Sequence, residues 1–207
     1  MSQEFVSFST NAMPPREAAR LFLSLVAPRP IAWVSTLSAS GVRNLAPFSF
    51  FNAVANHPPT VMIAIGQRQG RPKDTLRNVQ ETGEFVINLV DEHLAAAMNL
   101  TSGEWEAGVD EFQLANLAAA PSLEVKPPRV ADAPVAMEAR LTQIVPVAGT
   151  SATLVLGRIV RFHMRAALLR PNGLVDAAAL RPITRLGGEE YATIGSVFAM
   201  ARPEINK

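Results

Sequence analysis

The sequence predicts a mainly β protein, an antiparallel barrel with helices inserted between its strands. About six segments rich in Val, Ile, Leu and Phe have strand character, and they differ widely in length. The segments with helical periodicity do not alternate regularly with them, which argues against a doubly wound α/β sheet. Neither a Gly-x-Gly-x-x-Gly fingerprint nor a Gly-rich P-loop is present, so Rossmann-type dinucleotide binding is not supported either.

The first part of the chain is expected to form a helix and three strands. A helix over 16–26 follows two prolines, which suit a first helical turn, and its apolar residues recur on one face. A strand, a turn and a partner strand are expected at 31–37, 38–41 and 42–46. The next strand, 60–66, is nearly all apolar and is therefore expected to be buried on both faces.

The middle of the chain is more helical. Asp74 suits the N-cap of a helix through Thr82, and Gly83 stands where a C-terminal glycine is favoured. The remaining expected elements are a polar loop at 67–72, a strand at 84–90, a short helix at 91–100, a helix near 110–117 within the irregular segment 103–134, two long strands at 135–147 and 152–164, and short pieces from residue 165 onward.

Size and composition restrict the classes of function. The 207 residues are expected to form a single domain, 1–207, with a core at about 20–170 and a C-terminal extension at about 171–207. A net charge of +1 argues against a nucleic-acid binder. The chain has no cysteine, which excludes disulfides and thiolate catalysis, and its three scattered histidines argue against a metal site. No secretory signal or membrane-length apolar run is visible, so a cytoplasmic protein without membrane contact is expected.

Two clusters of polar residues predict a ligand site. In the segment 44–52, the polar residues Asn44, Ser49 and Asn52 are interleaved with aromatic and small ones, a mixture that suits a planar ligand with a polar edge. In 73–78, a lysine and polar residues stand at an expected helix start, where free N–H groups and the helix dipole favour a phosphate. Together the clusters indicate a phosphate-bearing aromatic cofactor. The alternative is that Asp74 only caps a helix and that the nearby cations are solvated.

Several motifs in order along the chain closely resemble the flavin reductase-like family of FMN-binding split-barrel proteins, relatives of flavoredoxin and of the reductase components of flavin-dependent monooxygenases. The motifs are 29–36 (Arg-Pro-Ile-Ala-Trp-Val-Ser-Thr), Gly41, 44–52 (Asn-Leu-Ala-Pro-Phe-Ser-Phe-Phe-Asn), Pro58-Pro59, 73–75 (Lys-Asp-Thr) with Asn78, 83–88 (Gly-Glu-Phe-Val-Ile-Asn), 157–163 (Gly-Arg-Ile-Val-Arg-Phe-His) and 185–188 (Arg-Leu-Gly-Gly) with Tyr191.

The resemblance implies a six-stranded antiparallel Greek-key split barrel that forms a homodimer with FMN at the subunit interface. The isoalloxazine would be lined by Asn44, Leu45, Ala46, Ser49, Phe50, Phe51 and Asn52. The ribityl-phosphate chain would lie against Ser35 and Thr36, and its phosphate near Arg68, Lys73, Asp74, Thr75 and Asn78. The walls would be Arg29, Pro30 and Trp33. Arg185 and Tyr191 would reach the partner's site, with a Gly-Gly turn and ordinary surface neighbours as the alternative.

The activity implied is hydride transfer from NADH or NADPH to flavin N5. The cofactor carries this chemistry, so no acid–base pair is needed. His163 and His57 are candidate contacts on the nicotinamide side, with a strand-end and a surface-loop role as their alternatives. Two other functions stay open: a carrier or assembly protein that holds FMN without turnover, and an oxidase or oxygenase with an organic substrate bound by 103–134 and 165–190. A flavin-dependent monooxygenase is a candidate partner.

Overall fold

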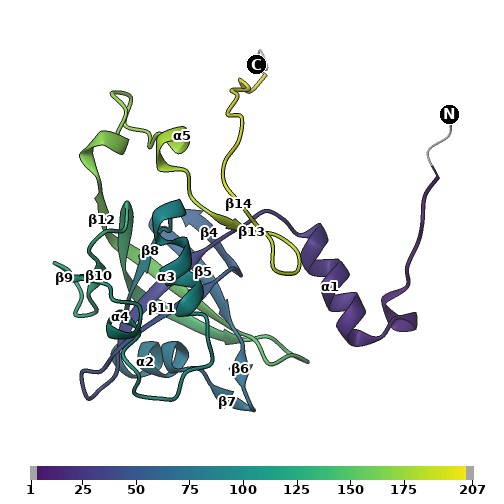
Figure 1. The fold of residues 1–207 in the computed structure, drawn as a ribbon, viewed down its shortest axis with the longest axis horizontal. Coiled ribbons are helices and arrows are strands. Elements are labelled where there is room, and N and C mark those ends of the chain that lie inside the picture. The colour runs from purple at the N-terminus through teal and green to yellow at the C-terminus, as the bar shows by residue number, and fades with distance from the viewer. Residues whose placement is uncertain (1–3, 204–207) are drawn as a thin grey trace.

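The structure is a computed structural model that describes residues 4–203, so the two ends of the expected domain lie outside the described residues. The mainly β class predicted from the sequence is confirmed (Figure 1). The strands are β1 (Arg29–Pro30), β2 (Ala32–Leu37), β3 (Arg43–Phe48), β4 (Phe51–Asn56), β5 (Pro59–Ile65), β6 (Gln67–Arg68), β7 (Arg71–Pro72), β8 (Glu84–Asn88), β9 (Ala119–Ala120), β10 (Arg129–Val130), β11 (Val135–Pro146), β12 (Thr153–Met164), β13 (Thr184–Arg185) and β14 (Tyr191–Ala192).

Most of the helices lie between groups of strands in the chain, and they do not alternate regularly with the strands. The α-helices are α1 (Pro15–Leu25), α2 (Asp74–Thr82), α3 (Ala95–Leu100), α4 (Glu111–Leu114) and α5 (Ala177–Leu180), and three 3-10 helices are η1 (Thr10–Ala12), η2 (Glu92–Leu94) and η3 (Ala166–Leu168). Within residues 4–203, no helix combines the length and the apolar character needed to cross a membrane.

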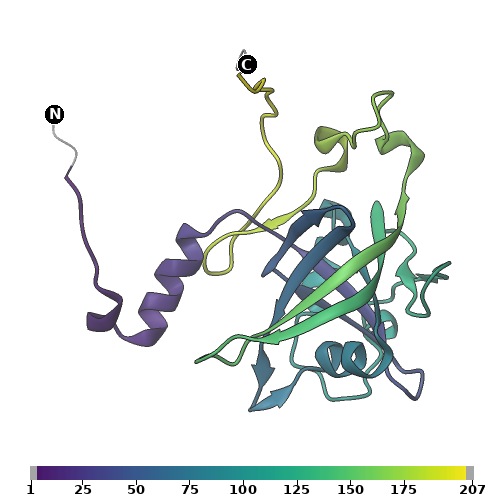
Figure 2. The same cartoon turned by 180° about the vertical axis from the view of Figure 1, so that it is seen from behind.

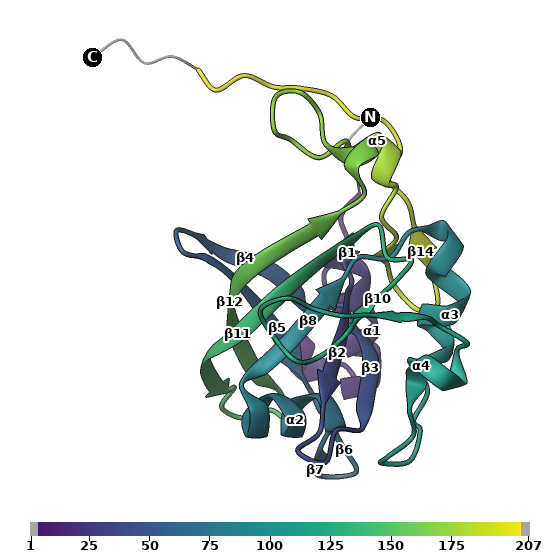
Figure 3. The same cartoon turned by 90° about the vertical axis from the view of Figure 1, so that its left-hand side faces the viewer.

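One large antiparallel sheet organises the fold, in the order β3-β2-β8-β11-β12-β5-β4. It has seven strands, where the resemblance implied six, and its two edge strands are not hydrogen-bonded to each other. The strand not foreseen is β4, which leaves the expected ligand segment at Phe51 and pairs with β5. Register shifts in the long β11–β12 pair mark bulges, which increase twist and let the sheet curl, as Figure 3 shows from the side.

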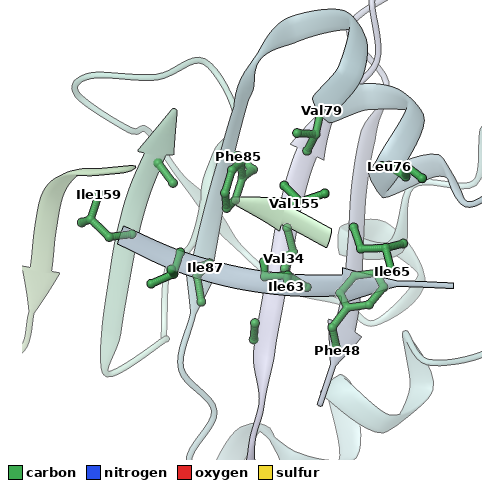
Figure 4. Packing of buried hydrophobic residues seen from close by; sticks show 13 residues of the cluster. Val34, Phe48, Ile63, Ile65, Leu76, Val79, Phe85, Ile87, Val155 and Ile159 are labelled. Carbon is green, nitrogen blue, oxygen red and sulfur yellow. The ribbon is translucent and has the colours of Figure 1, made fainter. Parts of the chain in front are cut away.

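The core fills the inside of the curled sheet (Figure 4). Helix α2 covers one end and inserts Leu76 and Val79 among the sheet's aliphatic and aromatic side chains. Gly157 of β12 allows the closest approach, because a Cβ atom there would lie 2.3 Å from Cζ of the fully buried Phe85.

Two local expectations are corrected. Strand β5 is not buried on both faces: Val61, Ile63 and Ile65 are buried, whereas alternate residues are only half-buried, because one face of the strand points away from the core. Asp74 is the first residue of α2 rather than its N-cap, and its carboxylate pairs with Arg77 at 2.6 Å. The expected end of α2 at Thr82 and the left-handed Gly83 after it, with φ of 71°, are confirmed.

Helix α1 stands apart from the sheet (Figures 1 and 2). The predicted helix is present, but none of its residues is buried, and Phe22 and Leu25 are 56% and 73% exposed. Its C-terminal end is held by the Arg29 guanidinium, which donates to the carbonyls of Leu23 and Val26. Ala18, Leu21 and Leu23 are half-buried, whereas the apolar side chains of Phe22 and Leu25 are left uncovered by the described part of this chain.

Candidate functional site

Three adjoining cavities form a cleft beside the turn between β3 and β4. The central compartment, about 430 Å³, is lined among others by Phe48, Ser49 and Phe50 of that turn and by Lys73, Arg185 and Tyr191. Pro47, Phe48, Lys73 and Ser102 also line a second, cationic compartment of about 490 Å³. Met98, Ser102, Arg185 and Tyr191 also line a third compartment, at the 95–102 and 183–191 segments.

The cationic compartment lies where the β6–β7 hairpin and the start of α2 meet. Its basic residues are Arg68, Arg71, Lys73 and Arg77. Arg68 donates to the carbonyls of Trp105 and Glu104, and Arg77 pairs with Asp74.

Arg71 and Lys73 are the two free cations of this compartment. Neither has a carboxylate within 4 Å among residues 4–203. The Lys73 ammonium lies 5.7 Å from the centroid of the Phe48 ring, at the junction with the central compartment. The arrangement offers positive charge next to an aromatic wall.

Three expected residues of the ribityl-phosphate end, Thr36, Thr75 and Asn78, form a buried hydrogen-bond network with Asn44, which was expected at the isoalloxazine. The Asn44 amide donates to the hydroxyls of Thr36, at 3.1 Å, and Thr75, at 3.0 Å. The Asn78 amide donates to the same Thr36 hydroxyl at 3.0 Å. Of the four, only Asn44 and Thr75 line the cationic compartment; Thr36 and Asn78 lie behind them and fix their orientation.

Residues on one face of β2 point away from the cleft. The Trp33 indole N–H donates to the Thr101 hydroxyl at 2.8 Å, and the Ser35 hydroxyl donates to the Pro128 carbonyl at 2.6 Å. Both side chains are fully buried, because alternate residues of a strand face opposite sides and this side is covered by the segment 98–130. The structure therefore separates Trp33 and Ser35 from the compartments.

The expected ring-binding segment 44–52 is divided between the cleft and other surroundings. Ser49 and Phe50 line the central compartment, and Asn44 and Ala46 line the cationic one. The remaining members, Leu45, Phe51 and Asn52, line neither compartment. Leu45 is fully buried in a core cluster on the other face of β3, and Phe51 and Asn52 follow the turn that directs the chain outward into β4. Pro30, expected as a wall, is exposed on β1 and lines neither compartment.

The two candidate histidines lie outside the cleft. His163 Nε2 is 2.5 Å from a carboxylate oxygen of the fully buried Glu138. That carboxylate also accepts from the backbone N–H groups of Leu123, Glu124 and Val125. Burial raises the pKa of Glu138, but these four donors outweigh burial and hold the pKa below its usual value. His57 is exposed and lines none of the compartments.

Arg29, Arg185 and Tyr191 line the central compartment of their own chain. Strands β1 and β13 place Arg29 opposite Arg185, and the Arg185 guanidinium stacks 4.5 Å from the Tyr191 ring centroid. The fold thus brings these three residues together at one end of the cleft, although Arg29 is far from the other two in the sequence.

The cationic compartment also contains a residue that the sequence did not single out, Glu111. Its buried carboxylate accepts from the Leu45 N–H at 3.0 Å. Burial, with smaller contributions from Asp74 and Asp110, raises the pKa of Glu111 to about 7. An acidic residue at the start of a helix is common, so no local signal distinguishes it.

The sequence pattern described as the flavin reductase like domain matches residues 24–180. The chain belongs to the flavin reductase-like family. Two relatives are an uncharacterized protein of Halalkalibacterium halodurans, BH2278, which is 37% identical over 98% of this chain and 99% of its own length, and an uncharacterized protein of Aquifex aeolicus, 42% identical over 83% of this chain and 87% of its own.

Solved structures of similar proteins have the same fold. Nitrilotriacetate monooxygenase component B from Bacillus cereus superposes with a TM-score of 0.92, at 35% identity over 96% of this chain and 100% of its own. The 2-nitrobenzoate 2-nitroreductase NbaA of Pseudomonas fluorescens has a TM-score of 0.87, at 31% identity over 96% of both chains. A Shewanella frigidimarina protein with a split barrel domain has a TM-score of 0.87 at 21% identity, over 98% of this chain and 100% of its own.

Proposed function

We propose that this flavin reductase-like protein binds FMN in the cleft and is an NAD(P)H-dependent flavin oxidoreductase. The single observation that carries the proposal is the placement of Arg71 and Lys73. These two cations without a carboxylate partner lie where a cavity with an aromatic wall meets the first turn of α2. That combination fits a ligand made of a flat ring and one phosphate.

The residues present fit each part of FMN. The ring would lie in the central compartment against Phe48 and Ser49, and the phosphate would be held by Arg71, Lys73 and the Thr75 hydroxyl. FMN supplies a ring system that accepts a hydride at N5 when it is bound. The chain itself would orient two rings, exclude water from the central compartment and neutralise the phosphate, so no acid–base side chain is required.

The second substrate is proposed to be NADH or NADPH. A nitroaromatic substrate is a second candidate, because NbaA is 31% identical over nearly the whole chain. Likeness to nitrilotriacetate monooxygenase component B supports a flavin-dependent monooxygenase as partner. An FMN carrier that does not react with nicotinamide, or an oxidase or oxygenase acting on an organic substrate, remains the alternative if no nicotinamide reduces the flavin.

A homodimer is proposed from the uncovered apolar residues at the two ends of the chain. Besides Phe22 and Leu25 of α1, large apolar side chains are exposed in both extended terminal segments: Phe5, Val6, Phe8, Val197, Phe198 and Met200. Such a surface is unusual for a monomer and is typical of an interface between subunits. Light scattering should give about twice the 22.2 kDa chain mass, and a monomer that still binds FMN would contradict a shared site.

The test of the proposal is FMN binding followed by anaerobic reduction. FMN fluorescence quenching should give a Kd that the double variant Arg71→Ala, Lys73→Ala raises by roughly 30- to 1000-fold, because two charge-assisted contacts are lost. Arg158→Gln removes an exposed cation of β12 outside the cleft and should leave the Kd unchanged. Stopped-flow mixing with NADH or NADPH should then bleach the bound flavin.

Two results would contradict the proposal in different ways. An unchanged Kd in the double variant would show that the phosphate lies elsewhere. Clear FMN binding without bleaching would exclude the reductase and leave the carrier or the oxidase.

A further inference from the structure

Two arginine side chains meet at the end of the cleft formed by β1 and β13. Arg29 and Arg185 are direct partners in the pairing of these strands, and both line the central compartment. Their charges are close enough that burial and the charge of Arg185 together lower the pKa of Arg29. Two neighbouring cations on one wall repel each other, and an anion bound between them would offset that repulsion by attracting both.

This pair has no counter-ion among residues 4–203, where no carboxylate oxygen lies within 4 Å of either guanidinium. Arg29 donates only to the carbonyls of Leu23, Val26 and Leu186. Arg185 donates to the Tyr191 hydroxyl and the Gly188 carbonyl.

One donor of the pair is left without a partner. The Nε–H of Arg29 is buried and makes no hydrogen bond. A buried charged donor without an acceptor is costly, so an acceptor from a ligand would relieve it.

FMN does not satisfy this pair in the proposed orientation. It has one phosphate, and the free cations Arg71 and Lys73 of the cationic compartment supply that group's partners. Arg29 and Arg185 do not line the cationic compartment, whereas Arg185 also lines the third compartment, on the other side of the central one. The cleft therefore has a positive group at each end, and a ligand with one phosphate can neutralise only one of them.

We infer that Arg29 and Arg185 form a second anion site, which holds a carboxylate or phosphate group of the substrate that enters beside the flavin. The inference rests on the proposed FMN cleft. The planar guanidinium of Arg185 offers a fork that suits either group, and the Tyr191 ring holds it in place. The third compartment adjoins this pair and gives room for the rest of the substrate.

The experiment measures anion binding to the FMN-loaded protein by titration calorimetry at low salt. One probe is ADP-ribose, which has the diphosphate of a dinucleotide but no hydride to donate, and the other is benzoate, an aromatic carboxylate. Arg185→Gln should weaken binding of the recognised probe by about 10- to 100-fold. Arg158→Gln, which removes one positive charge outside the cleft, should leave it unchanged.

The two probes separate the sources of the anion. Weakened binding of ADP-ribose supports a dinucleotide substrate, and weakened binding of benzoate supports an organic acid. If neither probe binds the wild type, or if both bind Arg185→Gln as well as the wild type, the inference is wrong. It is also wrong if Arg185→Gln loses FMN affinity while remaining folded by circular dichroism, because Arg185 would then serve the flavin.

Further measurements keep this test separate from that of the proposed function. FMN affinity and bleaching by the uncharged donor 1-benzyl-1,4-dihydronicotinamide test the reductase without an anionic substrate. Arg185→Gln should slow bleaching by NADH more than bleaching by this donor, because only NADH carries an anion. An equal loss for the two donors would overturn the inference. Should Arg185→Gln fail to fold, Arg185→Lys keeps the charge but not the fork, and unchanged probe binding in it would overturn fork recognition.

Discussion

Replacing Glu138 by Gln should destabilise the protein by about 2–4 kcal/mol. The carboxylate is fully buried and accepts from three consecutive backbone N–H groups, those of Leu123, Glu124 and Val125, and it pairs with His163. An amide has one acceptor oxygen. With that oxygen facing Glu124 and Val125, the NH₂ group faces the Leu123 N–H, so one buried donor is orphaned and the other bonds lose their charge.

The matched control for this prediction is Glu124→Gln. Its carboxylate pairs with Arg161 at 2.8 Å, but both side chains are about 40% exposed, so the loss should be below about 1 kcal/mol. Urea unfolding followed by circular dichroism gives both free energies of unfolding. If the two variants differ by less than about 1 kcal/mol, the buried carboxylate does not hold the 123–125 segment as argued.

The pH dependence gives an independent check of the same residue. The hydrogen bonds hold the pKa of Glu138 below its unfolded value of about 4.3. The unfolded chain therefore binds more protons on acidification, and the stability from this group is present above that pH and lost as the pH falls through the folded pKa. Glu138→Gln should lose this part of the acid sensitivity. If the free energy of unfolding of the variant falls with acidification as steeply as that of the wild type, the assignment is refuted.

Three further predictions concern other parts of the fold. Gly157→Ala should cost about 1–3 kcal/mol, since its Cβ would meet the Phe85 ring, whereas Gly195→Ala, with open space around it, should be nearly neutral in the same urea experiment. Glu111→Gln should stabilise the protein by about 1–3 kcal/mol at pH 8 but little at pH 5, because the raised pKa makes wild-type stability fall as the pH rises from about 4.5 to about 7. His163→Gln should lower stability without changing the KM for NADH, and a raised KM would restore His163 as a nicotinamide contact.

Local sequence signals predicted the positions of helices and strands more reliably than they predicted which side chains are buried. The bounds of α2 followed from a polar start and Gly83, both of which act within one turn. The strand β4 was missed because the turn at Ser49 depends on pairing of the next segment with β5, which is not a local property. The nearly all-apolar sequence of β5 gave no sign of which face was covered, because apolar residues are common on half-buried faces too.

The sequence indicated several residues that line the cleft, but it did not indicate which of the expected residues are buried behind it. Lys73 and Ser49 line the cleft as the motif suggested. Thr36 and Asn78 are instead buried behind it, because the Thr36 hydroxyl accepts from both Asn78 and Asn44, and only the fold brings β2, β3 and α2 together. Glu111 was missed for the same reason, since its burial beneath Leu45 arises from a contact between segments 66 residues apart in the sequence.

The uncovered helix α1 has a consequence for how the chain melts. An eleven-residue helix with no buried residue is barely stable on its own. Its order must come from Arg29, from its contact with Gly187 and from whatever covers Phe22 and Leu25. Amide hydrogen exchange in α1 should therefore slow as the protein concentration rises, while exchange in the large sheet should not change. The exchange rate in α1 would then measure the association of the subunits, and the exchange rate in the large sheet would measure the unfolding of each subunit.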